Sequence, residues 1–232
     1  MKKLSIIIPV YNEEMVTVES IRRILKTPVR GLTKELIIIN DGSTDKTATK
    51  LKQIKDRRCL IINHRANLGK GAAIRTALKV MTGDMAVIQD ADLEYDPADL
   101  DVLLAPILAG KADVVFGSRF LGGNPHRVLY FWHRVANFII TTICDMTTNL
   151  NLTDVETGYK AFTRDVAKKL KLSENRFNFD PEFTVRVARM GCRIYEVGIS
   201  YAGRSYANGK KISWRDGVLA IWAIIKYSLI KQ

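Results

Sequence analysis

The sequence predicts an α/β fold with a single domain, in which a mostly parallel central sheet has helices on both faces. Short apolar runs alternate with segments of helical periodicity from the first residues into the middle of the chain. Several of these runs are apolar throughout, which is typical of strands that are buried on both faces. With 232 residues, 47% of them hydrophobic, the chain can bury one substantial core.

Each expected strand is a short apolar run that stops at polar or turn-forming residues. The expected strands are residues 4–10, 35–40, 59–62, 85–89, 113–116 and 193–197. Helical patterns lie near residues 13–26, 44–55, 71–81 and 96–109. Alternation of this kind favours parallel strands joined by helical crossovers.

The charge and cysteine content limit the classes of partner. The chain has 36 Lys and Arg against 24 Asp and Glu, a formal net charge of +12, which predicts anionic partners. No nucleic-acid-binding motif is visible, and the acidic clusters described below would repel a nucleic acid, so none is expected. Cys59, Cys144 and Cys192 are far apart and lack metal spacing, which indicates reduced core residues. The N-terminus has no signal-like apolar segment, which favours a cytoplasmic location.

The most informative feature is the acidic sequence that ends the strand expected at residues 85–89. Asp90, Asp92 and Glu94 alternate along the chain, and extended residues two apart point the same way. Their oxygens suit a divalent cation such as Mg²⁺ or Mn²⁺, which would hold the phosphates of a nucleotide. The alternative is a solvated turn that caps a helix starting near Asp96, and an isolated Asp-x-Asp is more often of that kind.

Two earlier strands end in a similar way, which favours the metal site over the solvated turn. The strand at residues 35–40 stops at Asp41-Gly42-Ser43-Thr44-Asp45, and the strand at residues 4–10 stops at Tyr11-Asn12-Glu13-Glu14. Because the carboxyl ends of parallel strands meet at one edge, these polar residues are expected to share a crevice. A nucleotide pocket is the simplest interpretation.

Taken together, the motifs resemble glycosyltransferase family 2, in their order and spacing. The first four are residues 8–14, 40–45, 67–71 and 89–94, and three more are residues 116–119, 154–160 and 204–211. The last three resemble synthases of polyprenyl-phosphate sugars, with dolichyl-phosphate mannose and glucose synthases as the nearest subgroup. The resemblance spans roughly residues 4–216. It implies the GT-A fold and an inverting, metal-dependent transfer of a hexose from a nucleotide sugar to a polyprenyl phosphate.

The resemblance also implies roles for individual residues on the donor side. Contacts to the base and ribose would come from Pro9, Tyr11, Glu13 and Asp41. Asp90 would lie near the ribose and the metal, Asp92 would be the principal metal ligand, and Glu94 matches a position that is typically Gln in the mannose synthases. Lys70 would lie near the nucleotide, although a solvent-exposed lysine at a helix start is an equally simple explanation for it.

On the acceptor side, the resemblance implies that Arg119 and Arg134 bind the lipid phosphate. A phosphate acceptor is already largely ionised at neutral pH, since its second pKa is about 6, so it needs no strong general base. Arg204 and Lys210, or Lys211 in its place, match a loop that closes over the diphosphate.

Two pairs of acids allow more than one interpretation. Asp154 and Glu156 match a position from which related enzymes supply a carboxylate near the acceptor, and either of them could instead cap the helix that follows near Arg164. Which of the two faces the site is left open. Asp180 and Glu182 suit the start of a helix through the helix dipole, and the family also has an acid there.

Two apolar segments that carry aromatic and basic residues suit the surface of a membrane. They are residues 128–140 and 218–230. The second would be about 20 Å long as a helix, too short to cross a hydrocarbon core of about 30 Å. The sequence therefore predicts a GT-A domain at residues 1–217 and an amphipathic helix at 218–232, peripheral at the inner face of the membrane. Packing on the sheet or a homo-oligomer interface is the alternative.

Two rival functions are compatible with these motifs. A hydroxyl acceptor on a saccharide or a protein would make Asp154 or Glu156 a true base. A nucleotide-binding or membrane-surface module without catalytic activity is the rival from another class. The motifs do not distinguish UDP from GDP, or glucose from mannose.

Overall fold

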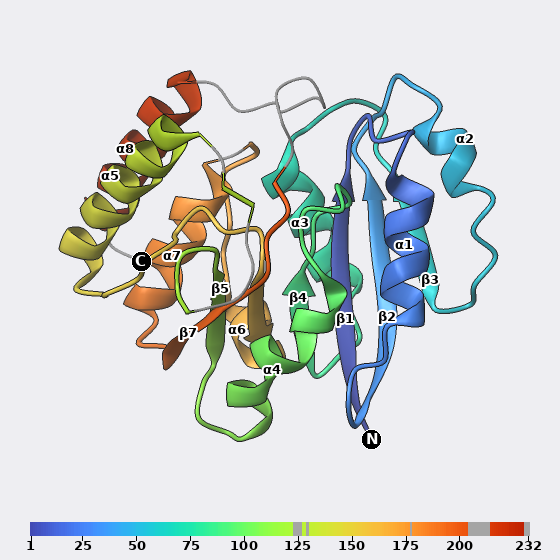
Figure 1. The fold of residues 1–232 in the computed structure, drawn as a ribbon, viewed down its shortest axis with the longest axis horizontal. Coiled ribbons are helices and arrows are strands. Elements are labelled where there is room, and N and C mark those ends of the chain that lie inside the picture. The colour runs from blue at the N-terminus through green and yellow to red at the C-terminus, as the bar shows by residue number, and fades with distance from the viewer. Residues whose placement is uncertain (123–126, 129, 177, 204–213, 230–232) are drawn as a thin grey trace.

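The computed structural model describes residues 1–122, 127–128, 130–176, 178–203 and 214–229. Within them, one seven-stranded sheet has the order β3-β2-β1-β4-β6-β5-β7 (Figure 1). Its strands are β1 (Lys2–Val10), β2 (Leu32–Asn40), β3 (Cys59–Asn63), β4 (Met85–Ile88), β5 (Val114–Ser118), β6 (Lys160–Thr163) and β7 (Ile194–Gly198).

The sheet is mostly parallel, as the sequence predicts. β1 pairs in parallel with β2 and β4, β2 with β3, and β5 with β7. β6 lies antiparallel to both β4 and β5, so it is the one strand of the described sheet that runs the other way. β6 is not among the expected strands. It has four residues, and it begins with a lysine, so it lacks the uninterrupted apolar run that marks its neighbours.

Helices cover both faces of the sheet. They are α1 (Thr17–Lys26), α2 (Thr47–Leu51), α3 (Lys70–Val80), η1 (Pro97–Asp99), α4 (Leu100–Leu108), α5 (Phe131–Thr148), α6 (Arg164–Lys169), α7 (Phe179–Arg189) and α8 (Trp214–Leu229). In β1, Ile6 and Ile8 point into the core under α1 and α4, whereas Ile7 points into the core under α3 and α7. This alternation accounts for a strand that is apolar at nearly every position.

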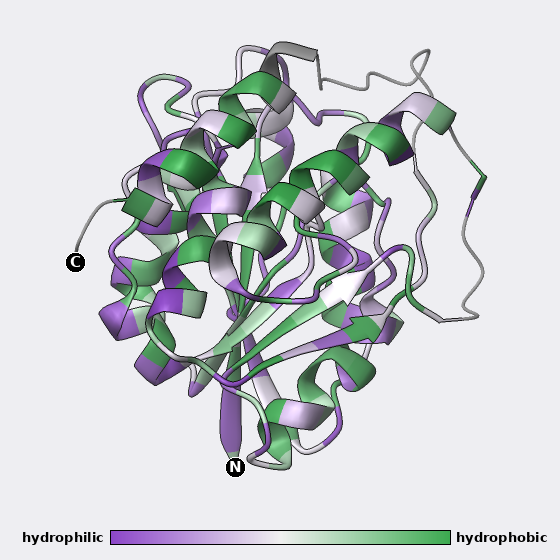
Figure 2. Cartoon of the chain, turned by 90° about the vertical axis from the view of Figure 1, so that its left-hand side faces the viewer, coloured by the Kyte–Doolittle hydropathy of each residue, from purple (hydrophilic) through white to green (hydrophobic). Residues whose placement is uncertain are grey.

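α8 packs against α5 and α7 on one side of the molecule (Figure 1). Its small and apolar residues Ala220, Ala223 and Ile224 are buried in the same core as α3 and α7. The other side of α8 carries exposed apolar residues, which the hydropathy colouring of Figure 2 shows on the helices of this side. The boundary expected at residue 217 stays a prediction.

The strand directions determine where the motifs gather. The carboxyl ends of the six parallel strands and the amino end of β6 lie at one edge of the sheet. The segments that leave this edge are residues 11–16, 41–46, 64–69, 89–96, 119–122, 154–159 and 199–203. Because each of the described motifs lies in or directly beside one of these segments, the fold brings them to one place.

Candidate active site

The first two polar turns, residues 11–14 and 41–46, are joined by hydrogen bonds. The Asn12 backbone N–H donates to Ser43 Oγ at 3.0 Å, and Asn12 Oδ1 accepts the Thr44 N–H at 2.8 Å. Asn12 has a φ of 50°, a left-handed conformation that asparagine tolerates. Tyr11 and Glu13 therefore lie beside the turn that begins at Asp41, as the pocket hypothesis expects.

Asp41 ties a third segment to these turns. Its side chain is almost fully buried and accepts hydrogen bonds from the backbone N–H groups of Leu68, at 3.0 Å, and Gly69, at 2.7 Å. His64 Nδ1 lies 2.6 Å from Asp41 Oδ1. The carboxylate thus holds the loop that leads into α3, where the helix dipole favours a negative charge. A base or ribose contact of Asp41 or Pro9 stays a prediction, and for Asp41 it would add to these bonds, since a carboxylate has about four lone pairs.

The acidic turn after β4 has an unusual backbone. Leu93 has a φ of 65°, a left-handed conformation that is costly for a bulky side chain and is concentrated at functional sites. Asp92 Oδ1 accepts the Glu94 N–H at 3.1 Å, and Tyr201 donates its hydroxyl to Glu94 Oε2 at 2.7 Å. The helix that follows has its own cap, because Asp96 accepts the Ala98 N–H at 3.0 Å. The acids are therefore not needed as helix caps.

Lysine and aspartate side chains alternate beside this turn. Lys70 Nζ lies 3.0 Å from Asp90 Oδ2 and 3.9 Å from Asp180 Oδ2. Burial alone would lower the pKa of Lys70, but Asp90 and Asp180 outweigh it and raise the pKa. Lys70 thus stays a cation at the candidate donor site, and it is not a solvent-exposed lysine.

Asp180 also holds a second, fully buried lysine. Lys160 Nζ, at the start of β6, lies 2.5 Å from Asp180 Oδ1 and donates to the Thr157 carbonyl at 2.5 Å. Glu182 has a different role, since its carboxylate accepts the Ser173 N–H at 2.9 Å and Arg186 Nε at 2.8 Å. The structure therefore brings Asp180 into the site and assigns Glu182 to the fold.

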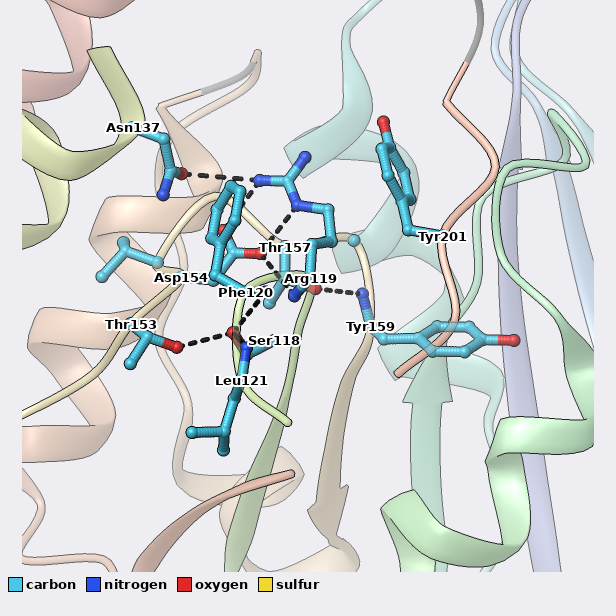
Figure 3. Close-up of polar contacts among 12 residues, drawn as sticks. Ser118, Arg119, Phe120, Leu121, Asn137, Thr153, Asp154, Thr157, Tyr159 and Tyr201 are labelled. Atoms are coloured by element: carbon cyan, nitrogen blue, oxygen red, sulfur yellow. Dashed lines mark hydrogen bonds and ion pairs between the residues drawn. The ribbon is translucent and has the colours of Figure 1, made fainter. Parts of the chain in front are cut away.

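Arg119 is fixed by Asp154 through a two-pronged ion pair (Figure 3). Arg119 Nε donates to Asp154 Oδ2 and Nη2 donates to Oδ1, each at 2.7 Å, and the Arg119 backbone N–H donates to the same carboxylate at 3.1 Å. Asp154 is fully buried. A bidentate contact between an arginine and a carboxylate is among the strongest hydrogen-bonded ion pairs in proteins. Asp154 serves to hold Arg119 and does not cap α6, whose cap is Thr163.

Arg134 and Arg119 both lie beside the ring of Phe120. The Cζ atom of Arg119 is 5.5 Å from the centroid of the Phe120 ring, and the Cζ atom of Arg134 is 5.8 Å from the same centroid. Arg134 is exposed on α5. The two arginines that the sequence assigns to one ligand are thus brought together at one ring.

Glu156 differs from the other buried acids. Its Oε1 atom is buried and has no hydrogen-bond partner among the described residues. Burial, followed by the charge of Asp180, raises the pKa of Glu156 to about 7, although Lys160 and Arg119 act in the opposite direction. The sequence leaves open which of Asp154 and Glu156 faces the site. Both carboxyl oxygens of Asp154 bind Arg119, whereas Oε1 of Glu156 has no partner among the described residues and could bind a substrate.

The sequence profile of the family described as Glycosyl transferase family 2 matches residues 5–171. The chain belongs to this family. The matched segment includes the motifs from β1 to β6, and the GT-A fold that the resemblance implies is confirmed. The site described above is therefore the candidate active site of a family 2 glycosyltransferase.

Two relatives of this chain are named for transfer to polyprenyl phosphates. A dolichyl-phosphate beta-glucosyltransferase, ALG5D, of Trichomonas vaginalis is 28% identical over 217 residues, which cover 85% of this chain and 65% of the relative. An undecaprenyl-phosphate 4-deoxy-4-formamido-L-arabinose transferase of Salmonella choleraesuis is 30% identical over 215 residues, covering 90% of this chain and 62% of the relative. The chain thus spans somewhat less than two thirds of the length of these two proteins.

An uncharacterised protein of Methanocaldococcus jannaschii, MJ1222, is closer in length. It is 26% identical over 228 residues, which cover 96% of this chain and 91% of the relative. Among solved structures, glucosyl-3-phosphoglycerate synthase of Mycobacterium tuberculosis has a TM-score of 0.75 and 20% identity, with 100% of this chain and 81% of that chain covered. That enzyme has also been solved with Mn²⁺, UDP-glucose and phosphoglyceric acid. At this identity the likeness shows the fold alone.

The carboxylates of the acidic turn suit a metal ion that is held partly by the protein and partly by a bound nucleotide. No group of three or more His, Cys, Asp or Glu that could hold a metal by itself occurs in the described part of the chain. Mg²⁺ at nucleotide sites is usually held by one or two carboxylates together with phosphates and water. Asp90, Asp92 and Glu94, which leave β4 on one turn, supply carboxylates of that kind.

Some expected site residues are not placed, and others were missed. Arg204 and Lys210 lie outside the described residues, as does Lys211. Lys160 and Tyr201 were not predicted, although both contact site residues. A lysine at the start of an apolar strand is the signal that could have pointed to Lys160, because a fully buried lysine needs an acidic partner.

Proposed function

We propose that this protein transfers a hexose, with inversion, from UDP-glucose or GDP-mannose to a polyprenyl phosphate at the cytoplasmic face of the membrane. The names of the relatives support the acceptor class, since two of them act on dolichyl and undecaprenyl phosphate. The motifs that resemble those of polyprenyl-phosphate sugar synthases lie, where the structure describes them, at one edge of the sheet. A divalent cation, Mg²⁺ or Mn²⁺, would neutralise the leaving diphosphate when bound.

The observation that carries the acceptor proposal is the pair of arginines at Phe120. Arg119 and Arg134 both contact this ring, and the first is held rigidly by Asp154. A phosphate monoester offers several anionic oxygens, which two neighbouring guanidinium groups can bind at once. A neutral sugar hydroxyl would gain much less from two positive charges.

In this proposal, different residues bind the donor and the acceptor. Asp90 and Asp92 would hold the metal with the diphosphate, and Lys70 adds a positive charge beside Asp90. Arg119 would direct the acceptor phosphate, whose oxygen is already ionised and attacks without losing a proton. Catalysis then depends on positioning two anions near each other and on neutralising their charges.

The membrane proposal rests on the exposed face of α5 and α8. Phe131 and Trp132 at the start of α5 are 68% and 75% exposed, and Trp222 in α8 is 55% exposed. Large apolar side chains of this kind beside basic residues suit the headgroup region of a bilayer. None of the helices in the described ranges combines the length and the apolar character that crossing a membrane requires.

The arginine pair can be tested by separating the two substrates. Arg134→Ala should raise the KM for a polyprenyl phosphate about tenfold or more and leave the KM for the nucleotide sugar nearly unchanged, since a charge-assisted contact to the acceptor is lost. Arg22→Ala, which removes an exposed arginine of α1, is the matched control. A change confined to the nucleotide-sugar KM would move Arg134 to the donor side and remove the main support for the lipid-phosphate acceptor.

A second candidate function is favoured by Glu156. A buried carboxyl oxygen without a partner and a pKa of about 7 suit a general base, which a hydroxyl acceptor needs. Glu156→Gln should cost about 10²–10⁴ in rate if the acceptor is a hydroxyl group. Measurable turnover in single-turnover assays across a range of pH, with polyprenyl phosphate as acceptor, would instead support the phosphate. Transfer to a simple glycoside that this variant loses would support the second candidate.

A further inference from the structure

Tyr201 lies between the acidic turn and Arg119. Its hydroxyl donates a hydrogen bond to Glu94 Oε2 at 2.7 Å. The Cζ atom of Arg119 lies 5.2 Å from the centroid of the Tyr201 ring, a distance at which a guanidinium and an aromatic ring attract each other. Figure 3 shows the two side chains next to each other. One side chain therefore contacts both halves of the candidate site.

The main chain holds Tyr201 in this position independently of its hydroxyl. The Ala202 N–H donates to the Glu94 carbonyl at 2.9 Å, and the Tyr201 carbonyl accepts the Arg127 N–H at 2.9 Å. The Tyr201 ring also packs against Tyr95, with 5.5 Å between ring centroids. Loss of the hydroxyl alone should therefore leave the residue in place, because the bond between the hydroxyl and the Glu94 carboxylate is not needed to position the segment.

The hydroxyl acts as a hydrogen-bond donor at neutral pH. A tyrosine ordinarily titrates at about pH 10, so its hydroxyl carries a proton at neutral pH. A phenol that keeps its proton donates to a carboxylate and fixes the carboxylate's orientation. Partners that hydrogen-bond to a metal-binding carboxylate typically change metal affinity or activity by about 10–100-fold when they are removed.

We propose that Tyr201 is a positioning residue that joins the two half-sites, with its hydroxyl orienting Glu94 at the metal-binding turn and its ring supporting Arg119 at the acceptor phosphate. This inference rests on the proposed function and adds a residue to it. The Glu94 contact is made by the hydroxyl alone, whereas Arg119 interacts with the ring as well as with the hydroxyl, so removing the hydroxyl abolishes the first contact and keeps the ring part of the second. Tyr201→Phe removes the hydroxyl and keeps the ring, whereas Tyr201→Leu removes both.

Binding measurements separate the two roles without relying on turnover. Mn²⁺ is titrated into the protein by calorimetry with saturating UDP, and separately with GDP, and farnesyl phosphate is titrated without metal. Tyr201→Phe should weaken Mn²⁺ binding about 10–100-fold and weaken farnesyl phosphate binding less than Tyr201→Leu does, because the ring stays beside Arg119. Tyr201→Leu should weaken Mn²⁺ binding by a similar factor and also weaken farnesyl phosphate binding about 3–30-fold. Tyr195→Phe, which removes a hydroxyl from a tyrosine of β7 that is 44% exposed, is the control and should change neither.

The outcomes distinguish this inference from the proposed function. Wild-type affinity of Tyr201→Phe for Mn²⁺ would overturn the role of the hydroxyl. Equal affinity of the Phe and Leu variants for farnesyl phosphate would overturn the role of the ring. In both cases the wild-type protein still binds Mn²⁺ with a nucleotide and farnesyl phosphate, so the proposed function survives. A wild-type protein that binds neither would overturn the proposed function and the inference with it.

Discussion

At the scale of single residues, the site is a row of buried or half-buried charges in which most carboxylates have a cation beside them. Asp154 has Arg119, Asp180 has Lys160, and Asp90 has Lys70. Such pairs cost desolvation energy when they form, and removing one partner leaves a charge buried without compensation. Glu156 differs, because one of its carboxyl oxygens is buried without a hydrogen-bond partner among the described residues, and this burial is the largest cause of its raised pKa.

Asp180→Asn should destabilise the fold by about 3–5 kcal/mol, because Lys160 is fully buried and would lose its carboxylate. The free energy of unfolding in urea measures this. Asp101→Asn is the control, since its partner Arg30 is 92% exposed and surface pairs contribute about 0–1 kcal/mol. Equal effects of the two substitutions would contradict the buried pair.

Glu156→Gln should change how stability depends on pH. Because the folded-state pKa is about 7 and the ordinary value is 4.5, the folded state binds a proton more tightly than the unfolded state. The stability of the wild type should therefore fall as the pH rises from about 4.5 to about 7, while the variant has no such loss at this position. Relative to the wild type, the variant should gain about 1–3 kcal/mol over this range. Urea denaturation at pH 4.5, 6 and 8 measures the difference, and a constant difference would show that Glu156 titrates normally.

At this scale the sequence predicts which residues gather at one edge of the sheet and misses how they pair. Asp180 fits a helix start, and its spacing alone cannot show that its carboxylate points at two lysines. The choice between Asp154 and Glu156 depends on Arg119, which is 35 positions away from Asp154 in the sequence. Contacts of this range follow from strand order, which local patterns do not specify.

At the scale of elements, glycines let the segments approach each other at the edge of the sheet. A Cβ atom on Gly158 would lie 2.5 Å from Asp90 Oδ2 and 2.8 Å from an atom of the Tyr95 ring. Gly69, with a φ of 99°, lies just before α3, where a Cβ atom would meet the Asn175 carbonyl oxygen at 2.2 Å. These close approaches set the distance between the acidic turn and its neighbours.

Gly158→Ala should weaken the binding of a Mn²⁺–nucleotide complex at least about tenfold, because the added methyl group displaces Asp90. Calorimetric titration with Mn²⁺ and UDP or GDP measures the affinity. Gly217→Ala in α8 is the control, since its Cβ atom meets nothing closer than 4.0 Å, and in a helix it should stabilise the fold by up to about 1 kcal/mol. Unchanged nucleotide affinity in Gly158→Ala would contradict the proposed position of Asp90 in the donor site.

Most of the elements were predictable because burial on both faces produces apolar runs of strand length, as in β1, β2 and β4. The ends of the helices were less predictable. The helix expected at residues 13–26 begins at Thr17, because residues 12–14 are engaged in the turn that contacts residues 43–45. The helix expected at 44–55 spans only Thr47–Leu51 for a similar reason.

At the scale of the whole molecule, Arg134 lies on α5, one of the two helices that carry the exposed apolar residues, so a lipid at this face would be near the proposed acceptor site. Trp132→Asp together with Trp222→Asp should weaken binding to vesicles that contain anionic lipids about tenfold or more, since a large apolar side chain contributes about 1.5–3 kcal/mol when it is buried. Vesicle co-sedimentation measures this. Leu60→Asp, at an exposed position of β3 far along the sheet, is the control. Equal binding of the wild type and the double variant would mean that this face does not contact a membrane.

The central claim is the transfer of a hexose to a lipid phosphate, and one assay tests it most directly. Radiolabelled UDP-glucose and GDP-mannose are incubated in turn with the protein and Mn²⁺, with and without vesicles that contain undecaprenyl phosphate. We expect one donor to label the lipid only when the polyprenyl phosphate and Mn²⁺ are both present, and we expect Asp92→Asn to abolish the label while the fold is retained. Label that appears on a hydroxyl acceptor such as a simple glycoside and never on the lipid would contradict the claim.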